Sequence, residues 1–125
     1  MAVAGIVAIA LTAAGEGGDA SATTVDPAEI ALGADLYAAN CAECHGADLD
    51  GTESGPPFLD LIYAPNHHAD EAFQRAAAFG VAPHHWGFGP MPPVEALTRD
   101  QVALIVAFVR QAQADAGIVR DPSHP

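Results

Sequence analysis

Apolar residues recur at helical spacing near the start of this chain and predict a helix over residues 26–40. Asp26 fits its N-cap, Pro27 its first turn and Glu29 the reciprocal capping position. Four residues share the face that we expect to be buried: Ile30, Gly33, Ala34 and Tyr37. The pattern stops at Asn40, directly before the first cysteine.

Two further segments follow the same period. Residues 70–79 predict a short helix that Gly80 ends. Residues 98–117 predict the clearest helix, because Thr98 and Gln101 form a capping box and Leu97 with Val102 a hydrophobic staple. Its buried stripe consists of Val102, Ile105, Val106 and Val109.

The segments between these helices predict loops. Residues 46–68 and 81–96 are rich in glycine, proline and polar residues, which do not continue a helix. No segment alternates apolar and polar residues as a half-buried strand does. The pattern therefore predicts an all-α fold with long loops.

Both ends of the chain differ from this helical domain of residues 26–117. Residues 1–14 are apolar apart from Thr12 but shorter than the roughly 20 residues that span a bilayer. They suit the apolar core of an export signal, although no basic residue precedes them, and an uncut membrane anchor is the alternative. Residues 15–25 predict a flexible tail or tether, and residues 118–125 a C-terminal tail.

The charge of the chain is strongly acidic. Sixteen acidic residues face four arginines and no lysine, a formal net charge of −12. Binding to nucleic acid is therefore excluded, because phosphates require a basic surface. Alanine is abundant and large side chains are few, so the helices enclose a thin core that a large bound cofactor would complete.

Both cysteines lie in the segment "CAECH", which covers residues 41–45. A redox disulfide expects such a pair at a helix start in a βαβ unit, which this chain lacks. A zinc site needs two more ligands, and the remaining histidines form the doublets His67–His68 and His84–His85, whose neighbouring side chains rarely converge on one ion. The pattern C-x-x-C-H is the attachment signature of c-type haem, and we favour that interpretation.

Together with the first helix, a Gly-Pro turn, a methionine loop and a C-terminal helix, this motif makes the chain resemble a small class I cytochrome c over about residues 27–117. The resemblance implies an all-α fold of three to five helices around one covalently bound haem c. It implies thioether bonds at Cys41 and Cys44 and axial ligation of iron by His45. In that family the first and last helices cross over a small residue, a position that Gly33 matches.

Further site residues follow from the resemblance and from the sequence. The family's Gly-Pro turn implies that Pro56, rather than Pro57, offers its carbonyl to His45. Met91 is the methionine available beyond Met1, and prolines on both sides fix its loop, so we expect it to be the second axial ligand. Trp86 is expected to donate its indole N–H to a haem propionate, with plain packing as the alternative. The two histidine doublets are the rival axial ligands and are otherwise expected to be solvated loop residues.

Two filled axial positions indicate a one-electron carrier and not an enzyme, and the resemblance implies the same. The alternative is a haem c module with a labile distal site, which binds a gas or serves as an electron-transfer subunit of a membrane enzyme complex. A third hypothesis is a metal-binding module that uses the histidine doublets and holds no haem.

Residues 76–94 carry no fixed charge, so we expect an apolar docking patch in an acidic body that attracts redox partners with a basic face. The apolar start of the chain favours a periplasmic protein, either soluble or tethered through residues 1–14.

Overall fold

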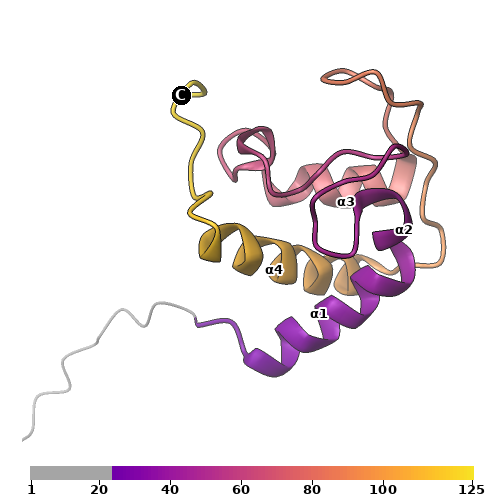
Figure 1. Ribbon diagram of the computed structural model, residues 1–125. Helices are drawn as coiled ribbons and strands as arrows, with labels where there is room; N and C mark the ends of the chain where they lie inside the picture. Colours follow the sequence, from indigo (N-terminus) through magenta and orange to yellow (C-terminus); the bar gives the residue numbers. More distant parts are fainter. Residues whose placement is uncertain (1–23) are drawn as a thin grey trace, which may run out of the picture.

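The computed structural model describes residues 24–125 (Figure 1). The predicted signal or anchor over residues 1–14, and most of the predicted tether over 15–25, lie outside this range. The described chain is helical, and its elements are α1 (Pro27–Asn40), α2 (Ala42–His45), the 3₁₀ helix η1 (Leu61–Tyr63), α3 (Asp70–Phe79) and α4 (Arg99–Asp115). The predicted all-α fold with long loops is confirmed. Within residues 24–125, no helix has the length and apolar character that crossing a membrane requires.

Helix α1 begins as its sequence predicts. Asp26 is the N-cap, and its Oδ1 accepts a hydrogen bond from the backbone N–H of Ala28 over 2.8 Å. The cap bond goes to the second helical residue rather than the third, and the described residues show no reciprocal bond from the Glu29 side chain. The backbone leaves the helical conformation at Cys41, where φ is −124°, and α2 is a separate short helix after that break.

Helix α4 begins with the predicted capping box. The Thr98 hydroxyl accepts from the backbone N–H of Gln101 over 3.2 Å, and the Gln101 side chain accepts from the backbone N–H of Thr98 over 2.9 Å. Two otherwise unpaired donors of the first turn are thereby satisfied. The helix ends near Gly117, whose φ of 78° is the left-handed conformation that glycine tolerates.

Helices α1 and α4 pack against each other, and Figure 1 shows them side by side in the lower part of the molecule. At their contact, a Cβ atom added to Gly33 would lie 2.1 Å from the carbonyl oxygen of Leu104. The crossing expected over Gly33 is therefore confirmed, and the absence of a side chain is what permits it. The core forms around this contact and includes the buried residues Tyr37, Leu49, Phe58, Ile105 and Val109.

The segment between α2 and α3 is held to α4 by two polar side chains. The amide of Gln113, which is 0% exposed, donates to the carbonyl oxygens of Phe58 over 2.9 Å and Tyr63 over 3.0 Å. Arg110 also donates to the carbonyl of Tyr63, over 2.7 Å, and to the Asp70 carboxylate, over 2.8 Å. These bonds satisfy loop carbonyls that would otherwise be buried without partners.

The C-terminal tail packs against the loop before α3. Asp121 is 4% exposed, and its backbone N–H donates to the side chain of Asn66 over 2.8 Å. Asn66 in return donates to the backbone carbonyls of Asp121 and His124. The tail is therefore fixed at Asp121, and it brings a carboxylate next to His67.

Candidate functional site

Cys41 is the residue at the break between α1 and α2, and Cys44 lies within α2. The carbonyl of Cys41 accepts hydrogen bonds from the backbone N–H groups of Cys44 over 3.2 Å and His45 over 2.9 Å, so residues 41–45 form one helical turn. Cys41 is half-buried, Cys44 is exposed, and both thiols are free. This turn presents two thiols and one imidazole from five consecutive residues.

His45 is buried and its ring is fixed. His45 is 8% exposed, and its Nδ1 donates to the carbonyl oxygen of Pro56 over 2.9 Å. The ring of Phe58 stacks on it, with centroids 4.2 Å apart and planes at 18°. Burial lowers the pKa of His45, against a smaller opposite effect of the Pro56 hydrogen bond. The neutral imidazole therefore carries its free lone pair on Nε2, the form in which histidine binds a metal.

The turn that carries Pro56 packs directly on α2. Thr52 donates its hydroxyl to the carbonyl oxygen of Cys44 over 2.6 Å, and its backbone N–H donates to the carbonyl of Gly55 over 3.0 Å. A Cβ atom at Gly55 would lie 2.7 Å from the carbonyl oxygen of Cys44. Glycine is thus required for this close approach, which sets the position of Pro56 relative to His45.

The chemistry of the cysteines argues against a redox pair. Burial, with a smaller effect of the neighbouring Cys44, raises the pKa of the Cys41 thiol to about 11. Reactive dithiols have the opposite shift, because the thiolate is the attacking species. A zinc site on the cysteines also lacks support. Among residues 24–125, the side chains close enough together to share a metal ion do not include Cys41 or Cys44.

Met91 is held by its backbone. It pairs with Val81 in an antiparallel bridge, with hydrogen bonds of 3.0 Å and 2.9 Å between the two residues. Gly80 allows this contact, since a Cβ atom there would lie 2.3 Å from the carbonyl oxygen of Met91. The loop was expected to hold the methionine without secondary structure, and the bridge supplies a firmer hold. The side chain is half-buried.

Trp86, in the same loop as Met91, packs against other aromatic rings. It stacks on Tyr63 with centroids 5.9 Å apart and planes at 30°, and it contacts Phe88 edge-on at 6.1 Å. This packing corresponds to the alternative that the sequence left open, and donation to a haem propionate stays a prediction. Figure 1 shows the loop between α3 and α4 on the same side of the molecule as α2.

The first histidine doublet departs from expectation, whereas His84 and His85 are exposed loop residues as expected. His67 and His68 are partly buried, and together with His85 they place ligand atoms within 4.8 Å of one another. The expectation that neighbouring histidines do not converge is wrong for His67 and His68, because their rings lie side by side at 11° and their ligand atoms are close together. The loop between α3 and α4 brings His84 and His85 next to this first doublet.

These residues fit a covalently bound haem c. The motif supplies two unpaired thiols about one helical turn apart, and an imidazole beside them whose Nδ1 is engaged and whose Nε2 is free to bind iron. Sequence reasoning missed the supports of this site, Phe58 and Gln113. Gln113 continues the stripe of α4 four residues after Val109, so the helical period was the available signal.

Comparisons with known proteins agree with this assignment. The family model for cytochrome c matches residues 30–113, a range that contains every predicted haem residue. Subunit CcoP of the cbb3-type cytochrome c oxidase of Rubrivivax gelatinosus is 46% identical over 92 residues, which are 72% of this chain and 28% of that subunit. Cytochrome CL from the marine methylotrophic bacterium Methylophaga aminisulfidivorans MPT has a similar fold, with a TM-score of 0.52 and 28% identity over 69% of this chain and 54% of that one. This chain therefore spans only about half, or less, of each relative's length.

Proposed function

Because this chain belongs to the cytochrome c family, we propose that it carries single electrons between redox partner proteins and catalyses no reaction of its own. Its cofactor is haem c, one per chain, and Cys41 and Cys44 hold it through thioether bonds. His45 would supply the imidazole ligand to the iron and Met91 the sulfur ligand. The hydrogen bond from His45 to Pro56 carries the proposal, since it fixes a buried imidazole with Nε2 free beside two unpaired thiols.

The bound haem supplies an iron that alternates between the ferric and ferrous states. Around it, the residues of this chain position ligands and exclude water. Phe58 covers one face of the His45 ring, and Gln113 and Tyr63 hold the segment on which Phe58 lies. An apolar, hydrogen-bonded shell of this kind sets the reduction potential and limits solvent access. With His45 and Met91 both bound to it, the iron would offer no position to a substrate.

Carbon monoxide tests this proposal on the exported, haem-loaded protein. A firmly bound Met91 resists displacement, so the reduced protein should leave carbon monoxide unbound, and a redox titration should follow a one-electron curve. Binding of carbon monoxide to the unaltered protein would instead favour the labile distal site and a gas-binding role.

A second candidate is a fixed electron-transfer module of a larger oxidase complex. It is favoured by the 46% identity to subunit CcoP, of which this chain spans 28%. Cell fractionation separates the two candidates. A free carrier is released by osmotic shock, whereas a fixed subunit sediments with the membranes and purifies together with oxidase activity.

The docking surface is proposed to lie around the Met91 loop. Phe79, the last residue of α3, is 79% exposed, and the bridge from Val81 to Met91 begins two residues later. Its exposed ring supports an apolar contact inside the uncharged segment 76–94, and the acidic body supports attraction of a basic partner. The periplasm is the proposed location, with residues 1–14 as export signal or tether.

A further inference from the structure

Five of the six histidines gather in one place beside the haem-site elements. They come from the loop before α3, the loop after α3 and the C-terminal tail, and their ring centroids lie 4.4 to 5.7 Å from those of their neighbours. The members are His67, His68, His84, His85 and His124. The proposed haem site uses His45 and Met91 and leaves this histidine cluster without a role.

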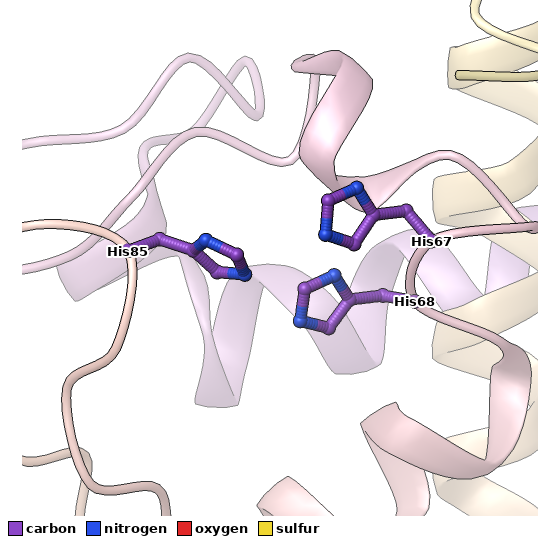
Figure 2. A group of neighbouring side chains, drawn as sticks. All are labelled: His67, His68 and His85. Carbon is purple, nitrogen blue, oxygen red and sulfur yellow. The ribbon is translucent and has the colours of Figure 1, made fainter. Parts of the chain in front are cut away.

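Three members converge closely enough to share one ion. His67, His68 and His85 each offer a nitrogen, and these atoms lie within 4.8 Å of one another. Figure 2 shows the ring of His85 pointing from its own loop towards the paired rings of His67 and His68. Two chain segments are thus brought to one point from opposite sides, a geometry that a metal ion would bridge.

The rings of the first doublet are oriented by hydrogen bonds at Nδ1. Nδ1 of His67 lies 2.9 Å from a carboxylate oxygen of Asp121, and Nδ1 of His68 donates to the carbonyl of Ile62 over 2.6 Å. Metal-bound histidines show this arrangement, in which a carboxylate or a carbonyl holds one ring nitrogen and leaves Nε2 for the ion. The carboxylate is itself held, because the backbone N–H and hydroxyl of Ser123 donate to it.

His84 lies outside this group of three but next to His68, and it offers a fourth nitrogen. Its Nε2 lies 3.5 Å from Nε2 of His68, and its Nδ1 lies 3.1 Å from the carbonyl oxygen of Ala82. Two nitrogens bound to one tetrahedral zinc ion at 2.0–2.1 Å lie about 3.3 Å apart. The spacing between His84 and His68 is therefore close to that of two ligands of a common ion.

Electrostatics favour the neutral ligand form of two of these imidazoles, His68 and His85. Burial lowers the pKa of His68, and partial desolvation together with the nearby His84 lowers the pKa of His85. Hydrogen bonds, first from Ser123 and then from His67, hold the pKa of Asp121 down at about 2, so its carboxylate is charged at neutral pH. Neutral nitrogens beside one anion attract a cation.

We propose that this histidine cluster is a second metal site, distinct from the haem, which binds one divalent ion of the imidazole-preferring class, Zn²⁺ or Cu²⁺, through His67, His68, His84 and His85. Calcium and magnesium prefer oxygen ligands, which the four-histidine set does not offer. The ion joins the loop before α3 to the loop that carries Met91, and so stiffens the latter. Asp121 is a positioning residue for His67.

The site also lies close to the proximal ligand through contacting rings. His68 contacts Tyr63 with centroids 5.0 Å apart, Tyr63 contacts Phe58 at 5.1 Å, and Phe58 stacks on His45 at 4.2 Å. A paramagnetic Cu²⁺ ion in the cluster is therefore near enough to affect the magnetic resonance signals of the haem site, while Zn²⁺ leaves them unchanged.

Metal titration of the exported, haem-loaded protein tests the proposal after a chelator has removed adventitious ions. Calorimetry should show one Zn²⁺ per chain, and the paramagnetic resonance spectrum of the Cu²⁺ form should show coupling to several nitrogens. The double variant His67→Gln/His85→Gln should lose at least 100-fold in affinity, and Asp121→Asn about 10-fold. His124→Gln, which alters a neighbouring ring outside the four ligands, should change the affinity less than threefold.

The haem spectrum separates this proposal from the assignment of the haem ligands, because none of these variants alters Cys41, Cys44, His45 or Met91. An unchanged haem spectrum shows that each variant is folded. Absence of stoichiometric binding to the unaltered protein would overturn the second metal site, as would copper spectra with oxygen ligands only. Equal affinity of the double variant would overturn it too, since the ion would then lie elsewhere on the acidic surface.

Discussion

Nδ1 of His45 donates a hydrogen bond to the carbonyl oxygen of Pro56 over 2.9 Å, across 11 residues of chain. The bond adds to the contact that the Thr52 hydroxyl makes with the Cys44 carbonyl, and it couples the imidazole itself to the turn. It makes the imidazole more electron-rich and fixes its orientation, two effects that an outer hydrogen bond has on a metal ligand. The position of the turn therefore controls the ligand.

Gly55→Ala tests this control. The added methyl would lie 2.7 Å from the Cys44 carbonyl oxygen, so the turn must shift away from α2 and the bond between His45 and Pro56 must lengthen. We expect a loss of about 1–3 kcal/mol in the free energy of urea unfolding, together with a changed reduction potential. Gly87→Ala is the control, since a methyl there meets nothing within 4 Å. Equal effects of the two variants would contradict the coupling.

Gln113→Ala should remove the support of the segment that carries Phe58. The buried amide donates to two loop carbonyls; its loss leaves that of Phe58 without this partner, while Arg110 still donates to that of Tyr63. A cost of about 1–3 kcal/mol in unfolding free energy is expected, the range for one unpaired buried group. The matched variant Gln111→Ala alters an exposed residue on the same helix and should stay within about 0.5 kcal/mol. A Gln113 variant as stable as this control would refute the role.

Met91→Leu should convert the iron into a site open to an external ligand. The backbone bonds between Val81 and Met91 do not involve the side chain, so the loop should remain closed and the stability should change by less than about 1.5 kcal/mol. Loss of the sulfur ligand should lower the reduction potential, because thioether favours ferrous iron. The reduced variant should bind carbon monoxide. If its near-infrared sulfur–iron band persisted, Met91 would not be the ligand.

Docking of a partner should depend on Phe79 and on ionic strength. Electron-transfer rates at low partner concentration should fall as salt rises, since steering by the acidic surface is screened. Phe79→Ser should weaken docking about tenfold, or about 1.4 kcal/mol, without altering the haem spectrum. Val119→Ser is the control. It removes an apolar side chain that is 65% exposed but lies outside the segment 76–94, and it should not weaken docking. A rate that is flat or rises with salt would exclude steering.

Local patterns predicted most of the helical framework. The cap at Asp26, the capping box of Thr98 and Gln101, and α3 over Asp70–Phe79 depend on residues within a few positions of each other. The crossing at Gly33 came from the family resemblance, and the motif from Cys41 to His45 is contiguous. Such features can be predicted because residues that are close in the sequence of a helix or turn are also close in the structure.

The missed features join residues that are distant in the sequence. The bond between His67 and Asp121 spans 54 residues, and that between Gln113 and Phe58 spans 55. The histidine doublets converge because the tail and the loop after α3 fold back on the loop before it. Periodicity places Gln113 on the buried face of α4 but does not identify its partner, and it gives no sign that the two histidine doublets meet.

The most direct test of the account is the mass of the exported protein and of its peptide containing Cys41 and Cys44. We predict one haem per chain, joined to both sulfurs of that peptide, and its complete absence from the variant Cys41→Ala/Cys44→Ala. Unmodified thiols, or a disulfide between the two cysteines, in correctly exported protein would contradict the account.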